Sequence, residues 1–358
     1  MKNWRLIDSK VLSAAENMAL DRVLLDSRSR GLVPDTLLFL EFTPCALVGY
    51  HQSVELEVED GYCREHGIEI NRRISGGGAI YMDEGTMGWA LFADKNTSGI
   101  PRDLDEMYAS ICNSVVIGLS KLGVEAKFRP KNDIEVNGRK ISGTGGTEHA
   151  SSFLFHGSLL IDFNVDTMVR CLKLPIKKLD DKQVQSFRQR VTSLREILGY
   201  VPEMRSIKKA LLEGFTEVFG ITFVPGDMTD GEEEMLRKET RVFSSEEWIR
   251  GGRRVPQSSE LKINDYKAPG GLIRVSVLLD RTRKRIKSTF ITGDFFAYPE
   301  RSILDLEACL RNSSCLEQDV AANVNRYFSE NDIRIPGVDA RDMSTAVCQA
   351  ISVSRSMM

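Results

Sequence analysis

The chain has 358 residues, a length that suits two domains better than one. Hydrophobic residues make up 42% of the sequence and charged residues 28%, which is typical of globular proteins and excludes a mostly disordered chain. The 48 Lys and Arg residues and 51 Asp and Glu residues give a net charge of -3, so the chain lacks the basic excess that is common in nucleic-acid-binding proteins.

The first part of the chain is expected to contain helices and strands in mixed order. Ser13 and Glu16 form an S-x-x-E capping box, which predicts the start of a helix. Apolar residues recur at helical spacing over residues 104–122, and Gly123 stands where a C-terminal cap belongs. Short apolar runs predict strands over residues 37–42, 46–50, 68–73, 79–81, 87–93 and 153–163, and apolar and charged residues alternate as in a strand over residues 124–128.

A basic and glycine-rich segment, Arg72-Arg73-Ile74-Ser75-Gly76-Gly77-Gly78, ends the expected strand 68–73. Consecutive glycines let successive backbone N–H groups converge on an anion, and a neighbouring guanidinium adds a planar charged donor. The same pattern also suits a flexible turn with solvated arginines. The chain has neither a Walker sequence nor a G-x-G-x-x-G segment before a helix, so neither nucleotide-binding fingerprint applies.

A hairpin is predicted around Asn137-Gly138, because this dipeptide is favoured at the two central positions of a tight hairpin turn. That register pairs residues 133–136 with residues 139–142, and strand side chains alternate between faces. Ile134 and Ile141 should then lie on one face. Four polar side chains should share the other face: Asp133, Glu135, Lys140 and Ser142. On this face a lysine is either oriented by carboxylates toward a ligand or simply solvated, and the hairpin alone leaves both open.

Side chains suited to metal binding or nucleophilic catalysis are few. The seven cysteines include no C-x-x-C pair, which indicates reduced thiols, and the four histidines include no pair at i, i+4 spacing. We therefore expect no metal site on the protein. His156 lies in the apolar run 153–163, where a hydrogen-bonded core residue is the commoner role, and no cysteine stands between residues 113 and 170.

The last part of the chain predicts a second, small domain. Residues 180–220 have a helical pattern, and the linker-like segment 251–256 suggests a boundary between a domain of residues 1–255 and one of residues 256–358. Beyond it, residues 272–279 and 285–292 predict a hairpin, and helical patterns follow from Pro299 onward. Strands precede helices in blocks, so the fold class expected for the whole chain is α+β.

The N-terminus has no apolar signal region, and no apolar run approaches the roughly 18 residues of a membrane span. We expect a cytoplasmic, monomeric protein that binds neither membranes nor nucleic acid.

Several motifs stand in an order that is known from one family. They are Asn17–Asp21, Val48–Gln52, Arg72–Tyr81, Asn132-Asp133, Gly138–Gly143 and His156–Leu160. This succession resembles the lipoate–protein ligase family of the biotin/lipoate ligase superfamily, over about residues 1–250. The segment 293–300 resembles part of the accessory C-terminal domain that some of these ligases carry.

The resemblance implies a fold and a reaction. The fold is a class II synthetase-like mixed sheet flanked by helices, with a small α+β accessory domain. In the reaction, free lipoate and Mg-ATP give lipoyl-adenylate and pyrophosphate, and the lipoyl group then passes to a specific lysine of a lipoyl carrier. The implied carriers are the E2 subunit of a 2-oxoacid dehydrogenase, the glycine-cleavage H protein, or a lipoate-binding protein of sulfur oxidation.

The resemblance also assigns roles by position. Lys140 matches the catalytic lysine that contacts the carboxylate and the α-phosphate, Asp133 matches the aspartate beside it, and His156 matches the histidine that lines the acyl site. The residues that match the segment wrapping the adenylate are Arg73, Ser75, Gly76, Gly77, Gly78, Ala79, Ile80 and Tyr81.

Two alternatives stay open. Octanoyltransferases of the superfamily act from acyl-carrier protein through a cysteine nucleophile, which in one branch lies three residues before the His-Gly pair. Phe153 stands at that position here, which disfavours thioester chemistry. The other alternative is a lipoyl-carrier-binding protein without catalytic activity.

Overall fold

The computed structural model describes residues 2–96, 100–130, 132–173, 185, 187–251, 261 and 263–355. The chain divides into two compact units. The first unit contains Met1–Leu47, Val58–Asn71 and Ile80–Ser245, and the second contains Val48–Glu57, Arg72–Ala79 and Glu246–Met358. Two short segments of the N-terminal half thus belong with the C-terminal part of the chain. The expected boundary at residue 255 falls outside the described residues and stays a prediction.

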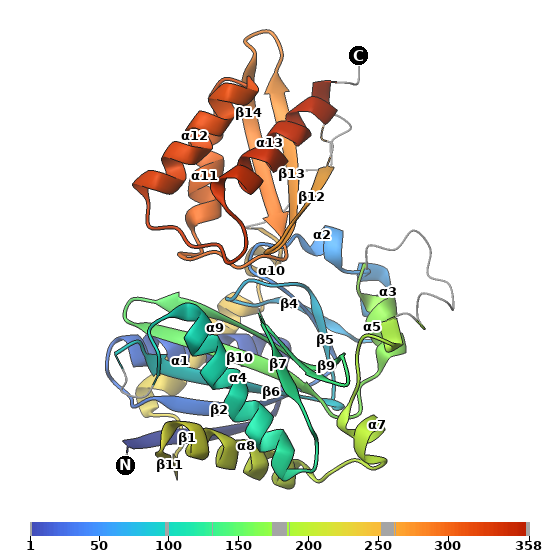
Figure 1. The fold of residues 1–358 in the computed structure, drawn as a ribbon, viewed down its shortest axis with the longest axis vertical. Coiled ribbons are helices and arrows are strands. Elements are labelled where there is room, and N and C mark those ends of the chain that lie inside the picture. Colours follow the sequence, from blue (N-terminus) through green and yellow to red (C-terminus); the bar gives the residue numbers. More distant parts are fainter. Residues whose placement is uncertain are drawn as a thin grey trace. The chain divides into compact units, whose positions relative to one another are not determined.

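The first unit is built on a mixed sheet with the strand order β11-β1-β2-β6-β10-β9-β8-β7 (Figure 1). Strand β1, next to the edge strand β11, pairs in parallel with β11 and β2, and the other neighbours pair antiparallel. The strands are β1 (Lys2–Leu12), β2 (Thr36–Phe42), β6 (Thr86–Asp94), β7 (Lys127–Arg129), β8 (Asp133–Val136), β9 (Arg139–His149), β10 (Ser152–Leu160) and β11 (Ile221–Pro225).

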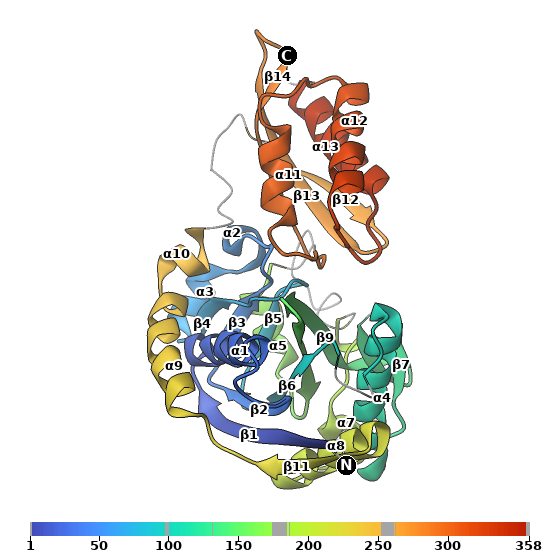
Figure 2. The same cartoon turned by 90° about the vertical axis from the view of Figure 1, so that its left-hand side faces the viewer.

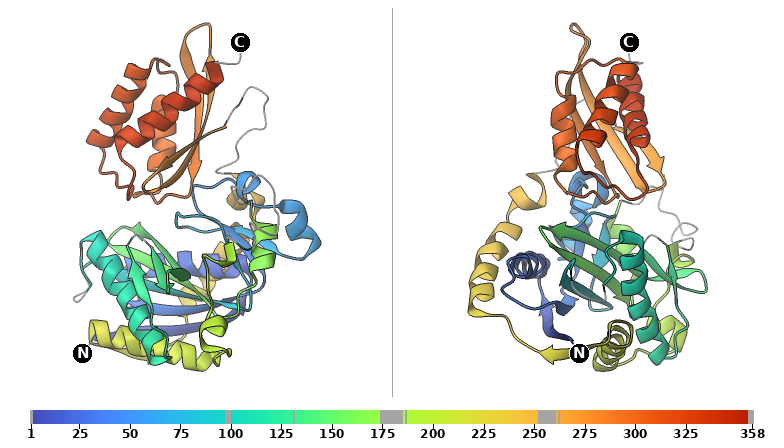
Figure 3. Two further views of the ribbon diagram at one scale, coloured as in Figure 1. Left: turned by 45° about the vertical axis from the view of Figure 1, so that its right-hand side comes forward. Right: turned by 60° about the vertical axis from the view of Figure 1, so that its left-hand side comes forward.

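Helices cover both faces of this sheet. Helices α4 (Leu104–Lys121) and α8 (Met204–Phe219) pack together on one face, and α1 (Ala14–Ser29) lies on the other beside α9 (Asp230–Phe243) (Figure 3). Helix α1 begins with the predicted capping box of Ser13 and Glu16. A small sheet with the order β4-β3-β5 is made by β3 (Cys45–Val48), β4 (Glu69–Arg72) and β5 (Ile80–Met82). Shorter helices are α3 (Asp60–Glu65), α5 (Val165–Cys171) and α7 (Leu194–Leu198).

Aromatic side chains fill the core between the large sheet and the α4–α8 pair. Trp89 stacks on Phe155 with ring centroids 5.9 Å apart, and Phe215 meets Trp89 edge-on at 5.8 Å. The Trp89 ring also covers Gly157 so closely that a Cβ there would lie 2.5 Å from it, which requires glycine. This packing fixes β10, and with it the orientation of its outer-facing residues.

The C-terminal part of the second unit is a three-stranded sheet covered by helices (Figure 2). Its strands are β12 (Ile263–Ala268), β13 (Gly271–Asp280) and β14 (Arg285–Gly293), and its helices are α11 (Ser302–Leu310), α12 (Glu317–Glu330) and α13 (Ala340–Arg355). The short helices α2 (Val54–Glu57) and α10 (Glu246–Ile249) also belong to this unit. Apolar residues of β13, β14 and the three helices form a separate core.

The predicted fold class is confirmed, since a large mixed sheet flanked by helices is joined to a small α+β C-terminal region. The predicted hairpin of residues 272–292 is also confirmed, as β13 and β14. Strand β12 was missed because most of its residues are polar and only Ala268 is buried. The strand expected at 124–128 is limited to β7, because residues 124–126 have no strand partner. No helix among the described residues is both long and apolar enough to cross a membrane.

One buried ion pair ties β1 to α9. The Arg5 guanidinium donates to both carboxylate oxygens of Glu232, each at 2.7 Å, and both residues are buried. Burial alone would raise the pKa of Glu232, but hydrogen bonds from Arg5 and Thr229 hold it below the ordinary value of 4.5. The pair therefore stabilises the fold above about pH 4.5, and this contribution is lost as the pH falls through the lowered pKa.

We predict that Arg5→Met lowers the free energy of unfolding by about 3 kcal/mol at pH 7, because it leaves a buried carboxylate without its partner. Urea unfolding of both proteins between pH 3 and pH 7 measures this, and the difference should shrink toward acid pH. The control is Arg64→Met, since Arg64 makes an exposed ion pair with Asp60 that should contribute little. Equal losses in the two variants would contradict the prediction.

Candidate functional site

The hairpin of β8 and β9 carries the lysine singled out by the sequence. Asn137 and Gly138 both have positive φ, at 51° and 76°, so the predicted two-residue turn is confirmed. Val136 faces Arg139 as expected. Beyond Glu135 and Lys140 the register shifts by one residue, so Asp133 faces Gly143 and not Ser142. The predicted Asp133–Ser142 and Ile134–Ile141 pairings are wrong, because a β-bulge inserts an extra residue in β9.

The bulge determines where Lys140 lies. Its ammonium nitrogen is 2.7 Å from Asp133 Oδ1, and a Cβ on Gly143 would come within 2.6 Å of that nitrogen. The side chain therefore lies across Gly143, where any larger residue would displace it. The side chain of Lys140 is 38% exposed and that of Asp133 is 12% exposed. The lysine is thus oriented by a nearly buried carboxylate while its charge stays accessible to a ligand.

Neighbouring groups hold this pair in place. The Asp133 carboxylate also pairs with Arg129, whose guanidinium reaches Glu135 at 2.7 Å. The backbone of Lys140 is fixed on both sides, because its N–H donates to the Arg190 carbonyl at 2.8 Å and its carbonyl accepts from the Thr192 N–H at 2.9 Å. Sequence patterns gave no sign of the contact with residues 190–192, which are distant in the chain.

His156 lies on β10, on the face opposite the aromatic core. Its cross-strand neighbours are Ala90 on β6 and Gly145 on β9, and those of Ser158 are Gly88 and Gly143. These four small residues, Gly88, Ala90, Gly143 and Gly145, form what we call the small-residue strip. Since Lys140 lies across Gly143, the strip connects the lysine with His156 along one face of the sheet. The sequence analysis noted His156 but missed the strip, which only strand pairing brings together.

In the second unit, Arg72 is a structural residue. It is 2% exposed, and its guanidinium donates to several backbone carbonyls. Those carbonyls belong to Gly49, Tyr50, Gln52, Trp248 and Ile249. The guanidinium thus connects three segments of this unit, and the alternative of a solvated arginine at this position is wrong.

The glycine-rich loop is also packed. The Arg73 guanidinium donates to the carbonyls of Gly76 and Gly78, at 3.1 Å and 2.9 Å. Gly77 has a φ of 96° and donates its N–H to the Phe295 carbonyl at 3.3 Å. A Cβ on Gly76 would come within 2.6 Å of the same carbonyl oxygen. In this conformation the glycines serve close packing against the β14–α11 connection.

The residues expected to wrap the adenylate are therefore divided between the units. Arg73 and residues 75–79 belong to the second unit, whereas Ile80 and Tyr81 lie on β5 of the first. Ser75 and Tyr81 are buried, and Ala79 and Ile80 are half-buried. Burial and the nearby Asp83 carboxylate raise the pKa of Tyr81, so its hydroxyl stays protonated at neutral pH. No cluster of His, Cys, Asp and Glu that could hold a metal ion occurs in the described part of the chain.

The thiols of the first unit are inaccessible. Cys45, Cys63, Cys112 and Cys171 each have no exposed surface. Burial raises the pKa of the Cys112 thiol to about 12, and burial also raises that of Cys45. Cys63 contacts the Cys171 carbonyl, and a hydrogen bond from the Cys171 thiol lowers the pKa of Cys63. Even so, a thiol without exposed surface cannot reach a substrate in this conformation.

Comparison with known proteins identifies the family. Residues 13–216 match the lipoyl protein ligase A/B catalytic domain family. The chain belongs to this family. It is 30% identical over 271 residues to the octanoyltransferase LipM of Kyrpidia tusciae, covering 69% of this chain and 98% of the relative. It is 28% identical over 300 residues to lipoate–protein ligase 1 of Staphylococcus aureus, covering 82% of this chain and 87% of the relative.

Solved structures agree with this result. A lipoate–protein ligase A bound with ATP superposes with a TM-score of 0.61 at 26% identity, over 70% of this chain and 98% of that one. The Plasmodium falciparum LipL1 structure shares the fold over 97% of this chain and 99% of its own, with a TM-score of 0.76 at 18% identity. The chain is therefore an enzyme of the lipoyl and octanoyl transferase–ligase family.

We predict that brief iodoacetamide treatment of the folded protein at pH 8 leaves the first-unit cysteines unmodified. Cys309 and Cys348 of the second unit, which are partly exposed, should react first. Peptide mass spectrometry measures each site, and protein unfolded in guanidinium serves as the control in which all seven cysteines react. Rapid labelling of Cys63 in the folded protein would show an accessible thiolate and contradict the prediction.

Proposed function

We propose that the chain is an ATP-dependent lipoate–protein ligase. A carboxylate oxygen of free lipoate attacks the α-phosphorus of Mg-ATP and displaces pyrophosphate. The amine of a carrier lysine then attacks the carbonyl carbon of lipoyl-adenylate and displaces AMP. The proposed acceptor is a lipoyl carrier such as an E2 lipoyl domain, since a related archaeal ligase from Thermoplasma acidophilum is described together with its E2 lipoyl domain.

The position of Lys140 is the observation on which this proposal rests. Lipoate and ATP are both anions, so the first step needs a fixed positive charge where negative charge accumulates. The Lys140 ammonium is held by Asp133 across Gly143 and remains partly exposed. It can contact a substrate carboxylate and a phosphate oxygen together, because an ammonium has three donor hydrogens.

The small-residue strip supports the acyl part of the proposal. A lipoyl chain that starts at Lys140 would lie along Gly143 and Gly145 toward His156. Backbone without large side chains lets an extended chain approach the sheet closely. The proposal also includes contact of the adenylate with Arg73, residues 75–79, Ile80 and Tyr81. For the Gly77 N–H to bind the ligand, it has to give up its hydrogen bond to the Phe295 carbonyl.

An octanoyltransferase is the second candidate, because several similar relatives carry that name. Two observations favour the ligase. The thiols of the first unit are buried, whereas the octanoyltransferases of the superfamily use a cysteine nucleophile. The match to the Staphylococcus aureus ligase also extends over 82% of this chain, compared with 69% for the Kyrpidia tusciae octanoyltransferase.

The deciding experiment is exchange of labelled pyrophosphate into ATP. We expect exchange that depends on free lipoate or octanoate and needs no carrier protein. A parallel reaction offers octanoyl acyl-carrier protein and an apo E2 lipoyl domain without ATP. Acyl transfer in that reaction, together with no exchange for either free acid, would establish the octanoyltransferase and exclude the ligase.

We predict that Lys140→Ala lowers the exchange rate at least about 100-fold, because the transition state loses its fixed positive charge. The variant should keep the melting temperature of the wild type, since a partly exposed ion pair contributes little to stability. Lys209→Ala, which removes an exposed lysine from α8, is the matched control and should change neither quantity.

Gly143→Ala tests the position of the lysine separately from its charge. The added methyl group would meet the Lys140 side chain, whose flexible end can move, so stability should change little while exchange slows. Gly61→Ala is its control, because a Cβ there meets no atom within 4 Å. Wild-type exchange in both Lys140→Ala and Gly143→Ala would rule out the role given to Lys140.

A further inference from the structure

The turn between β13 and β14, together with the first residues of β14, concentrates positive charge. Five of the seven residues from 281 to 287 are cationic, namely Arg281, Arg283, Lys284, Arg285 and Lys287, while the whole chain has a net charge of -3. All five are exposed. Like charges this close repel one another, so this cluster of cations slightly opposes folding of the hairpin. The stability of the fold therefore does not explain why the cations are gathered here. We call these five residues the basic tip.

Contacts within the protein leave most of this charge uncompensated. Arg281 donates to the Ser354 carbonyl at 3.1 Å and Arg285 to the Asn312 carbonyl at 2.7 Å. Carbonyl oxygens are neutral, so these bonds orient the guanidinium groups without cancelling their charge. Among the described residues, Asp280 is the one carboxylate in ion-pair contact with the tip, at 3.5 Å from Arg283. The hairpin projects past the ends of α11 and α12 (Figure 3).

A hollow of about 470 Å³ adjoins the tip. Arg283, Lys284 and Arg285 line it together with the connection of residues 312–316 and the first turns of α12, where Asp319 adds one carboxylate against the three cations. Leu316, which is 47% exposed, adds an apolar side chain within this basic rim. A charged rim around an exposed apolar residue is typical of protein–protein interfaces.

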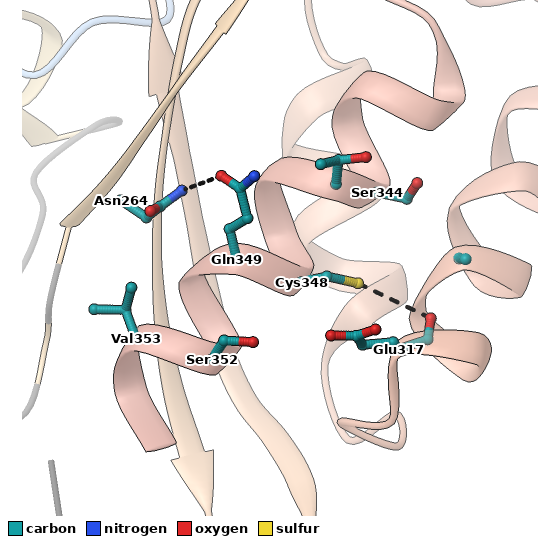
Figure 4. Close-up of a pocket in the computed structure, with 9 residues that line it drawn as sticks. Asn264, Glu317, Ser344, Cys348, Gln349, Ser352 and Val353 are labelled. Carbon is teal, nitrogen blue, oxygen red and sulfur yellow. Dashed lines mark hydrogen bonds between the residues drawn. The ribbon is translucent and has the colours of Figure 1, made fainter. Parts of the chain in front are cut away.

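A second hollow in the same unit differs in character. It measures about 520 Å³ and lies between α12, α13 and β12 (Figure 4). Its lining is mainly neutral, with the Asn264–Gln349 hydrogen bond at 3.3 Å and a carboxylate at Glu317. Its one charged lining residue is a carboxylate, so it does not favour an acidic partner, whereas cations outnumber carboxylates in the hollow at the basic tip.

We propose that the basic tip docks an acidic surface of the carrier protein that receives the acyl group. This inference rests on the proposed function, because an enzyme that modifies a lysine of another protein must bind that protein. A chain with net negative charge repels an acidic partner at long range, so the attraction has to come from a local patch. The hollow has no aromatic lining on which nucleic-acid bases could stack, which favours a protein partner.

The test uses a triple variant of the full chain, Arg283→Gln, Lys284→Asn and Lys287→Gln. It keeps Arg281 and Arg285, whose guanidinium groups bond to the backbone, and asparagine suits the positive φ of 52° at position 284. The matched control is Arg205→Gln, Lys209→Gln and Arg237→Gln, which removes the same charge from exposed sites on α8 and α9. The probes are an apo E2 lipoyl domain and an apo H protein.

We expect the dissociation constant for one of these carriers to rise about tenfold in the tip variant at 50 mM salt and to change less than twofold in the control. The difference should shrink as salt screens the charges. Lipoate-dependent pyrophosphate exchange, which needs no carrier, should be unchanged in both. If the wild type showed no exchange while the tip variant still weakened carrier binding, the proposed function would fail and the docking surface would stand.

Equal carrier affinities of the tip variant and the control would overturn the proposal, as would a wild type that binds neither carrier. Selective loss of binding to a single-stranded RNA or to vesicles containing phosphatidylglycerol, with carrier affinity unchanged, would also overturn it.

Discussion

The ion pair between Lys140 and Asp133 is the interaction on which the proposed chemistry depends. A lysine on an ordinary hairpin would sample many rotamers in water, and its charge would serve no particular ligand atom. Here the β-bulge places Asp133 opposite Gly143, and the absent side chain of that glycine leaves room for the lysine. The backbone of Lys140 is anchored by residues 190–192 as well. Orientation is therefore established before substrate binds, which is what electrostatic catalysis requires.

The glycine-rich loop of the second unit has a clear packing role, and ligand binding is proposed for the same loop. Arg72 holds the chain segments of this unit together through carbonyl groups, and Gly76 and Gly77 allow the close approach of Phe295. Their residue types are thus required by packing, whether or not a nucleotide binds. This loop belongs to the same unit as the β12–β14 sheet, and the Gly77–Phe295 hydrogen bond connects it to the segment that follows β14.

Chemistry and partner recognition make different physical demands, and the two proposals assign them to different residues. Activation of a carboxylate needs one precisely held cation in a partly buried site, the role proposed for Lys140. Recognition of an acidic protein needs several exposed cations whose field extends over about one Debye length, near 8 Å at physiological salt. The basic tip has that character, since five exposed cations lie within seven residues. Under the proposed roles, variation at the tip alters carrier choice without disturbing the reaction.

The sequence by itself determined the family-like order of motifs, the capped start of α1, the Asn137-Gly138 turn and the α+β class, because these depend on local residue types and spacing. It missed β12, whose polar residues do not alternate clearly with buried ones. Tertiary structure alone decided the register beyond Glu135, since a bulge has no reliable local signature. It alone also assembled the small-residue strip from β6 and β9, and joined the glycine-rich loop to the C-terminal part of the chain. Contacts between residues far apart in the sequence determine these features, and no local pattern records them.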